Sequence, residues 1–254
     1  MTSSTSKADP APFDLPGAGK AGALCLHGLT GTPYEVRSLG EALAKRGIRA
    51  RGPALPGHNE TPECLARTTH GEWRAAVREH LRGLRAEHER VFVVGMSMGG
   101  LLSLDVAAEQ PVDAVVTVGV PLRLSRPVEW LVPLLKYLRP TVSKDEGSDI
   151  RDAAARERHP SYEVMPLAAV HELLRLQRRV RASLQRVTAP IYIAHGAHDK
   201  TANPEDARVI HAGVGSEVRE LAIFESSGHV VPVDFDGPAL ARASADFLAR
   251  YAGE

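Results

Sequence analysis

Short apolar runs and longer amphipathic segments alternate along this chain. Six short segments have the length of strands, and one of them, 91–94, is continuously apolar, as in a strand that is buried on both faces. They lie at 23–28, 48–55, 91–94, 114–119, 191–196 and 220–225. Between most of them, apolar residues recur every three or four positions, as in a helix with one buried face. This alternation predicts an α/β fold in which helices cover both faces of a mostly parallel, doubly wound sheet.

Two predicted helices begin with the signal of a capping box, in which a Thr and a Glu three residues later cap each other's backbone N–H groups. Thr32 and Glu35 predict one such start, for a helix that ends at Gly47. Thr69 and Glu72 predict the second. Both Glu side chains are therefore expected to serve local helix capping.

Between 121 and 186 the alternation breaks down and no convincing strand is predicted. Two apolar helical stretches, near 128–138 and 167–184, flank a charged connector. We interpret this segment as a small helical cap over the carboxyl edge of the sheet, where open α/β sheets bind ligands. Ordinary crossover helices are the alternative. Some apolar side chains of the first stretch are expected to line an acyl pocket: Val128, Trp130, Leu131, Leu134, Leu135 and Leu138.

The predicted organisation is one domain with an insertion. Residues 1–19 are expected to form a flexible polar tail, 20–120 and 187–254 the core, and 121–186 the helical cap. The length of 254 residues suits this arrangement.

Composition excludes several classes of protein. Lys and Arg together number 31, as do Asp and Glu, so charge does not favour nucleic acid or an anionic membrane. No segment approaches the length of a membrane span, and the N-terminus lacks the apolar core of a signal peptide. We therefore expect a cytoplasmic protein. Cys25 and Cys64 lie far apart without metal-ligand spacing and are expected to be reduced, inert thiols.

The strand predicted to end at Val94 leads directly into Gly-Met-Ser-Met-Gly, residues 95–99, and a helix-forming stretch follows. A strand that becomes a helix with almost no loop requires tight backbone angles. Gly95 and Gly99 relieve the crowding, and Ser97 is pushed out at the apex. This is the pattern of a nucleophile elbow. The motif by itself leaves a glycine-rich turn as an alternative.

A nucleophilic serine needs a base within hydrogen-bond reach, and the base needs an orienting acid. In folds with this elbow the chain order is serine, acid, histidine. Asp199 and His229 follow the last two predicted strands in that order, at the same sheet edge as Ser97. We predict that Ser97 is the nucleophile, Asp199 the acid and His229 the base. Asp234 and Asp236 are alternative acids, although both come after His229.

A tetrahedral intermediate also needs N–H donors for its oxyanion. The usual pair is the residue after the nucleophile and one in an early strand–helix loop, which here are Met98 and Leu29. His27 is expected to brace that early loop, 27–33, rather than to transfer protons. Three more histidines are interpreted as structural or exposed: His171, His195 and His198.

Five segments together carry a family resemblance: "LCLHGLTGTPYEVRSLGEALAKRG", "PALPGHNETPE", "VVGMSMGG", "GAHDK" and "SSGHVVPVD". From about residue 20 to the C-terminus, the chain resembles the bacterial carboxylesterase and monoacylglycerol-lipase branch of the α/β-hydrolases. The resemblance implies the same triad and oxyanion donors, a small helical cap, and no cofactor or metal. One departure is Asn59, where the loop usually reads Gly; asparagine tolerates left-handed backbone angles.

The predicted function is hydrolysis of short- to medium-chain carboxylic or monoacylglycerol esters through an acyl-enzyme. A small-molecule ester is the expected partner, and the sequence leaves the oligomeric state open. Thioesterase, acyltransferase, lactonase or cofactor-free haloperoxidase activity could use the same residues. A ligand-binding protein without turnover is a further alternative, which an intact triad in the expected order disfavours.

Overall fold

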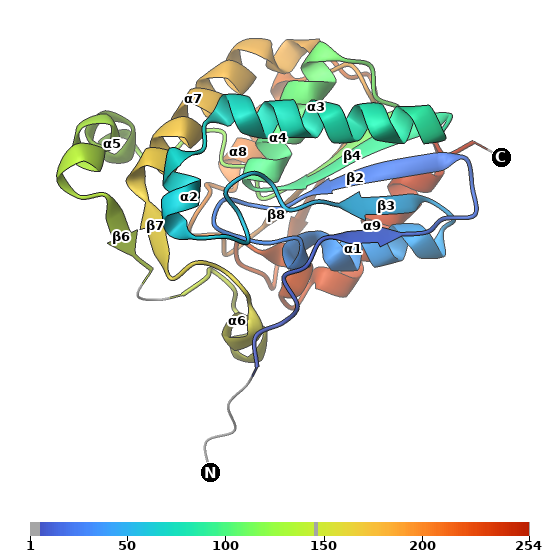
Figure 1. The fold of residues 1–254 in the computed structure, drawn as a ribbon. Coiled ribbons are helices and arrows are strands. Elements are labelled where there is room, and N and C mark those ends of the chain that lie inside the picture. The colour runs from blue at the N-terminus through green and yellow to red at the C-terminus, as the bar shows by residue number, and fades with distance from the viewer. Residues whose placement is uncertain (1–5, 145–146, 254) are drawn as a thin grey trace.

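We describe the protein from a computed structural model in which residues 6–144 and 147–253 are placed. A seven-stranded sheet runs through its centre, in the order β1-β3-β2-β4-β5-β8-β9 (Figure 1). Only the pairing of β1 with β3 is antiparallel. The strands are β1 (Phe13–Leu15), β2 (Ala21–Leu26), β3 (Arg49–Gly52), β4 (Arg90–Met96), β5 (Ala114–Val118), β8 (Ile191–Gly196) and β9 (Arg219–Phe224). All six predicted strands are present.

Helices cover both faces of this sheet, as the sequence predicts (Figure 1). One face carries α1 (Tyr34–Lys45) and α9 (Gly237–Ala249). The other carries α3 (His70–Glu87), α4 (Met98–Glu109), α7 (Leu167–Ser183) and α8 (Glu205–Gly213). A short α2 (Pro62–Arg67) precedes α3, and two 3-10 turns lie at Leu184–Arg186 and Val231–Val233.

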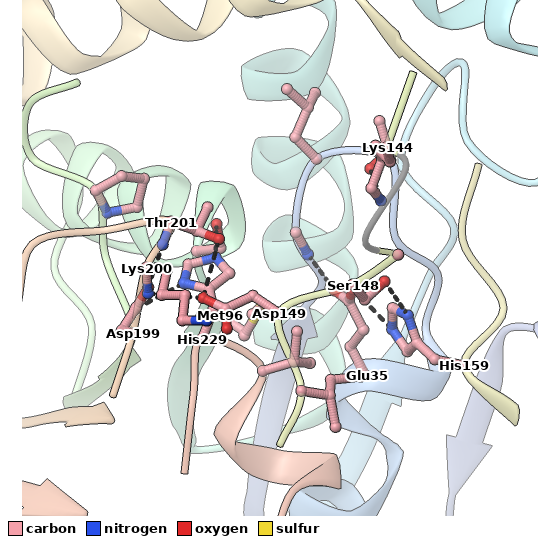
Figure 2. A pocket seen from close by; sticks show the side chains of 18 of the residues that line it. Glu35, Met96, Lys144, Ser148, Asp149, His159, Asp199, Lys200, Thr201 and His229 are labelled. Atoms are coloured by element: carbon pink, nitrogen blue, oxygen red, sulfur yellow. Dashed lines mark hydrogen bonds and ion pairs between the residues drawn. The ribbon is translucent and has the colours of Figure 1, made fainter. Parts of the chain in front are cut away.

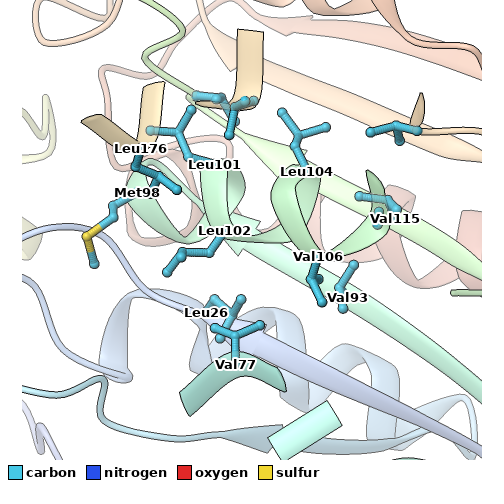
Figure 3. Packing of buried hydrophobic residues seen from close by; sticks show 14 of the residues in the cluster. Leu26, Val77, Val93, Met98, Leu101, Leu102, Leu104, Val106, Val115 and Leu176 are labelled. Atoms are coloured by element: carbon cyan, nitrogen blue, oxygen red, sulfur yellow. The ribbon is translucent and has the colours of Figure 1, made fainter. Parts of the chain in front are cut away.

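The two-residue repeat of a strand divides the core into two layers. In β2, Leu24 and Leu26 pack with α3 and α4, whereas Ala23 and Cys25 pack with α1 and α9. Figure 3 shows the first layer, in which leucines of α4 lie against side chains of the central strands. Burial raises the pKa of the Cys25 thiol to about 12, and both cysteines are free, so Cys25 matches the expected inert thiol.

One of the two predicted capping boxes is correct. Thr69 caps α3 by accepting the Glu72 N–H, and the Glu72 carboxylate accepts the Thr69 N–H at 2.8 Å. The prediction for α1 is wrong: its N-cap is Pro33, with no side-chain capping bond. Glu35 turns inward and accepts the Gly28 N–H at 2.7 Å. A buried backbone donor has therefore outcompeted the local cap.

The expected flexible tail differs from the structure at residues 13–15. These form edge strand β1, and Phe13 is buried in the core. The Phe13 ring fills the space above Gly40 and Gly52, where added methyl carbons would lie 2.6 and 2.2 Å from it. Residues 1–5 of the same tail lie outside the described part of the chain. The boundaries proposed for core and cap stay a prediction.

The segment 121–186 is mainly helical but also contains two short strands that the sequence did not predict. It comprises α5 (Arg126–Leu138), β6 (Thr141–Ser143), α6 (Ala153–Arg158), β7 (Val164–Pro166) and α7. β6 and β7 pair antiparallel. The first half of α7 packs with Val132 of α5, whereas Leu176 and Val180 in its second half join the main core. Helix α7 therefore serves both as cap and as crossover.

Replacement of Phe13 by alanine tests whether β1 belongs to the core. Loss of this buried ring is expected to reduce the free energy of unfolding by about 3 kcal/mol, because Phe→Ala changes in cores leave a cavity. Urea unfolding followed by circular dichroism measures the change. Phe235→Ala, at a ring that is 57% exposed, is the control and should change stability by less than about 0.5 kcal/mol. Equal small effects would show that β1 is only loosely attached.

Candidate active site

The turn between β4 and α4 holds Ser97 in a sparsely populated backbone conformation, with φ 54° and ψ −117°. The chain around it is tightly packed. A Cβ at Gly95 would lie 2.1 Å from the Gly99 carbonyl oxygen, and one at Gly99 would lie 2.1 Å from that of Leu26. Glycine is therefore required at both positions, as the elbow motif predicts. The turn directs the Ser97 side chain into a pocket at the carboxyl edge of the sheet.

The three residues predicted as nucleophile, base and acid are joined by hydrogen bonds, and Figure 2 shows the side chains of His229 and Asp199 in the pocket. Ser97 Oγ is 2.9 Å from His229 Nε2, and His229 Nδ1 is 2.7 Å from Asp199 Oδ2. The carboxylate can only accept, so Nδ1 carries the proton and Nε2 is free to accept the Ser97 hydroxyl proton. This tautomer is the one that a general base needs.

Four donors hold the Asp199 carboxylate. Its Oδ1 accepts the N–H groups of Thr201 and Ala202 at 2.8 and 2.7 Å. Its Oδ2 faces His229 and also Nε2 of His195, 2.9 Å away. Burial alone would raise the pKa of Asp199, but these histidines and N–H groups lower it below its ordinary value. His195, interpreted from sequence as structural or exposed, is a fully buried partner of the acid.

Neither alternative acid is available to His229. The carboxylate of Asp234 accepts the backbone N–H groups of Arg151, Asp152, Gly228 and Phe235. That of Asp236 accepts from the Ser226 N–H and the Ser227 hydroxyl, both at 2.8 Å. Both aspartates thus brace the loop that carries His229.

The loop predicted to supply an oxyanion donor packs against Ser97. A Cβ at Gly28 would lie 3.3 Å from Ser97 Cβ. The Gly28 carbonyl accepts from His27 Nδ1 at 2.9 Å and from the Gly31 N–H at 3.2 Å. Because a trans peptide directs its C=O and the next N–H oppositely, the Leu29 N–H points away from these two donors. It has no acceptor among the described residues.

His27 has the bracing role expected from sequence. Its Nε2 accepts the Leu55 N–H at 3.1 Å, so the ring proton must be on Nδ1, which donates to Gly28. Burial lowers the pKa of His27 and keeps the ring neutral. The second predicted donor, Met98, is the first residue of α4, where N–H groups have no partner within the helix.

A cavity of about 1080 Å³ opens above Ser97. Part of its wall is apolar and comes from Leu29, Pro121, Leu124, Met165, Val170 and Leu173. Another part is polar and includes Lys144, Ser148, Asp149 and His159 of the cap (Figure 2). The expectation that leucines of α5 line this pocket is wrong: Leu131, Leu134, Leu135 and Leu138 are exposed. Only Val132 of this helix is buried, against α7.

Two pocket residues were missed by sequence reasoning. Glu35 and His159 are both almost fully buried, and His159 Nε2 lies 3.1 Å from Glu35 Oε1. His159 Nδ1 is 2.8 Å from the Ser148 hydroxyl. The capping pattern gave Glu35 a different role, and no pattern marked His159. The left-handed conformation expected of Asn59 is present, with φ 58°.

Comparison with known proteins assigns the family. A model of the family described as serine aminopeptidase, S33, matches residues 18–236. The chain belongs to this family. It is 33% identical over 239 residues to a thermostable monoacylglycerol lipase of Bacillus sp. (strain H-257), covering 92% of this chain and 93% of the relative. It is 30% identical over 226 residues to a carboxylesterase of Bacillus subtilis (strain 168), covering 89% and 90%.

Solved structures agree with this assignment. One of the metagenome-derived lipolytic enzymes LipS and LipT superposes with a TM-score of 0.90 at 28% identity, over 96% of this chain and 99% of the other. A monoacylglycerol lipase of Paleococcus ferrophilus shares the fold, with a TM-score of 0.81 at 18% identity over 96% and 100%. The predicted α/β-hydrolase fold and the resemblance to carboxylesterases and monoacylglycerol lipases are confirmed. The protein is a serine hydrolase.

Neither a membrane-spanning helix nor a metal-binding cluster occurs in residues 6–144 and 147–253. None of their helices has both the length and the apolar character that crossing a membrane requires. They also contain no group of three or more His, Cys, Asp or Glu side chains that could hold a metal ion.

The protonation of His229 can be tested without any substrate. Burial lowers the pKa of His229, but the charge of Asp199 outweighs it, so the pKa is raised above 6.5. Asp199→Asn should therefore lower the pKa of His229, because the effect of burial is then opposed only by the weaker charges of Asp149 and Glu35. NMR titration of the ring, assigned with His229→Gln, measures both values. Asp236→Asn is the control and should shift the pKa little; equal shifts in the two variants would contradict the assignment of Asp199.

Proposed function

We propose that this chain hydrolyses carboxylic esters of short- to medium-chain acids, monoacylglycerols among them, through an acyl-enzyme on Ser97. The observation that carries the proposal is the line of contacts from Ser97 Oγ through His229 to Asp199 at the base of a partly apolar cavity. The relatives named as a monoacylglycerol lipase and a carboxylesterase support an ester as substrate.

The proposed reaction has two halves. His229 Nε2 takes the Ser97 proton as Oγ attacks the ester carbonyl carbon, and the N–H groups of Leu29 and Met98 stabilise the oxyanion. Protonated His229 then donates to the leaving alcohol, which leaves the acyl group on Ser97. Water, deprotonated by the same His229, attacks the acyl-enzyme, and His229 then returns this proton to Ser97 Oγ as the acid is released. Asp199 stays ionised and supports the imidazolium in both halves.

The two kinds of wall suggest how the substrate lies. The apolar side chains near Leu124 and Val170 suit the acyl chain, because each buried CH₂ contributes about 0.8 kcal/mol. The polar wall formed by the cap suits a hydrophilic leaving alcohol. A cytoplasmic location stays a prediction.

Ser97→Ala is expected to lower kcat by several orders of magnitude while the fold persists, because the members of a triad act as a unit. Turnover of p-nitrophenyl butyrate measures the loss, and circular dichroism checks the fold. A fluorophosphonate should label wild-type protein at Ser97 alone. Full activity in the alanine variant would remove Ser97 as the nucleophile. Faster turnover of thioesters or of aminoacyl p-nitroanilides in the same assay would change the substrate class.

The acyl site can be located by narrowing the cavity. Leu124→Trp is expected to shift the optimum of a p-nitrophenyl ester series toward shorter acyl chains, because the larger ring fills space beside the apolar wall. Leu134→Trp places the same ring on α5 at a side chain that is 70% exposed, and it should leave the profile unchanged. Values of kcat/KM across the series measure the shift. A shift in the second variant alone would place the acyl chain against α5 instead.

A further inference from the structure

Glu35 is an ionised side chain in the protein interior, where charged groups are rare. It is 4% exposed and lines the cavity beside Ser97. Its two oxygens face different parts of the molecule (Figure 2). Oε2 accepts the Gly28 N–H at 2.7 Å, and Oε1 lies 3.1 Å from Nε2 of His159 in the cap. The esterase reaction proposed above leaves this side chain without a role.

The loop 27–31 wraps around the Glu35 carboxylate. A Cβ at Gly31 would lie 2.1 Å from Oε1, so a larger residue there would displace the carboxylate. Between Gly28 and Gly31 lie Leu29 and Thr30, and Thr30 has a positive φ of 62°. The carboxylate therefore lies against both glycines of a tight loop that also carries the Leu29 N–H.

Two bonds fix the backbone on either side of the Gly28 α-carbon. Glu35 holds the Gly28 N–H, and His27 holds the Gly28 carbonyl. Fixing both peptide groups leaves the Leu29 N–H little freedom to rotate. Without Glu35, the Gly28 N–H would lose its acceptor in a buried site, and the preceding peptide could turn to find another one.

The cap supports the carboxylate from the opposite side. His159 follows α6, and its Nδ1 lies 2.8 Å from the hydroxyl of Ser148. Burial would raise the pKa of Glu35, but the contact with His159 and the Gly28 N–H lower it to about 2. The carboxylate is thus ionised throughout the range in which a serine hydrolase works, so both of its oxygens stay acceptors.

We propose that Glu35 is a positioning residue for the oxyanion hole. Its carboxylate holds the Gly28 N–H, and this orients the Leu29 N–H toward the substrate oxygen. This inference rests on the proposed function. It differs from helix capping, which the same residue would serve only through the N–H groups of α1.

Two substitutions separate positioning from packing. Glu35→Leu keeps the volume but has no acceptor, whereas Glu35→Gln keeps an acceptor oxygen for Gly28. The leucine variant is expected to lower kcat about 10- to 100-fold, because misplacement of a catalytic donor is costly. Its KM should change less than about threefold, since the Leu29 N–H acts mainly in the transition state. The glutamine variant should stay within about threefold of wild type in kcat.

A transition-state analogue provides an independent measurement. A trifluoromethyl ketone forms a tetrahedral adduct with a serine and places its oxyanion at the N–H donors. Its affinity is expected to fall in Glu35→Leu as much as kcat does, and to recover in Glu35→Gln. If the leucine variant does not fold, Glu35→Asp replaces it: the shorter side chain withdraws the acceptor from Gly28 but keeps the charge, and the same losses are expected.

Asp105→Leu is the matched control. This carboxylate is equally buried, but it bonds Arg74 and Arg179 between α3, α4 and α7. It should lower stability and leave kcat and analogue affinity within about threefold of wild type, when all variants are measured well below their unfolding temperatures. An equal fall in kcat in Asp105→Leu and Glu35→Leu would reduce the effect to general destabilisation.

The amide proton of Gly28 distinguishes failure of this inference from failure of the proposed function. Its NMR resonance should lie downfield in wild type and in Glu35→Gln, and move upfield in Glu35→Leu. Absence of ester turnover in wild type would overturn the proposed function, but the Gly28 resonance would still report whether Glu35 holds this N–H. An unchanged resonance, unchanged kcat in Glu35→Leu, or a glutamine variant as impaired as the leucine variant would each overturn the positioning role.

Discussion

The close approach of three backbone segments at Ser97 is the constraint on which the rest of the site depends. The turn after β4, the start of α4 and the end of β2 come so near one another that side chains at 95 and 99 would clash with carbonyl oxygens. Ser97 adopts a positive φ there, at a cost of about 1–3 kcal/mol. Ten consecutive residues of α4, from Met98 to Ala107, are buried. The packed core thus holds the strained turn in place and fixes where the hydroxyl lies.

The cap is joined to this core through the loops that carry Asp199 and His229. The carbonyl of Asp149 accepts the N–H groups of His229 and Val230, and its Oδ2 accepts the Lys200 N–H at 2.7 Å. One residue of the insertion therefore contacts both loops at once. Asp234 adds two more links by accepting the N–H groups of Arg151 and Asp152. Movement of the segment near 149–152 would disturb the loops of Asp199 and His229 as well as the cavity wall.

Sequence patterns correctly predicted the structural features that depend on the periodicity of apolar residues and on the order of residues along the chain. The strands, the flanking helices and the meeting of Ser97, Asp199 and His229 follow from these, because parallel strands end at one edge of the sheet. Features that depend on contacts between residues far apart in the sequence were not predictable. The spacing of Thr32 and Glu35 fits a capping box, yet the Gly28 N–H wins the carboxylate. The leucines of α5 fit a pocket equally well, but an amphipathic pattern does not say which surface its apolar side faces. β1 is only three residues long and has too few positions to show a period.

A buried anion beside an oxyanion hole disfavours the negative charge that forms on the substrate oxygen. The charge of Glu35 also acts on His229, and the two effects must be considered together. In the proposed reaction, attack by Ser97 creates two charges in one step, an oxyanion and an imidazolium. Burial lowers the pKa of His229, whereas Asp199, and after it Asp149 and Glu35, raise that pKa by favouring the protonated ring. The Glu35 charge therefore stabilises the imidazolium while it disfavours the oxyanion, and the two effects oppose each other. What does not cancel is the orientation of the loop, since the hydrogen bond to Gly28 is directional and the Coulomb effect is not. The carboxylate is consequently compatible with the reaction, because its hydrogen bond to the Gly28 N–H orients the loop.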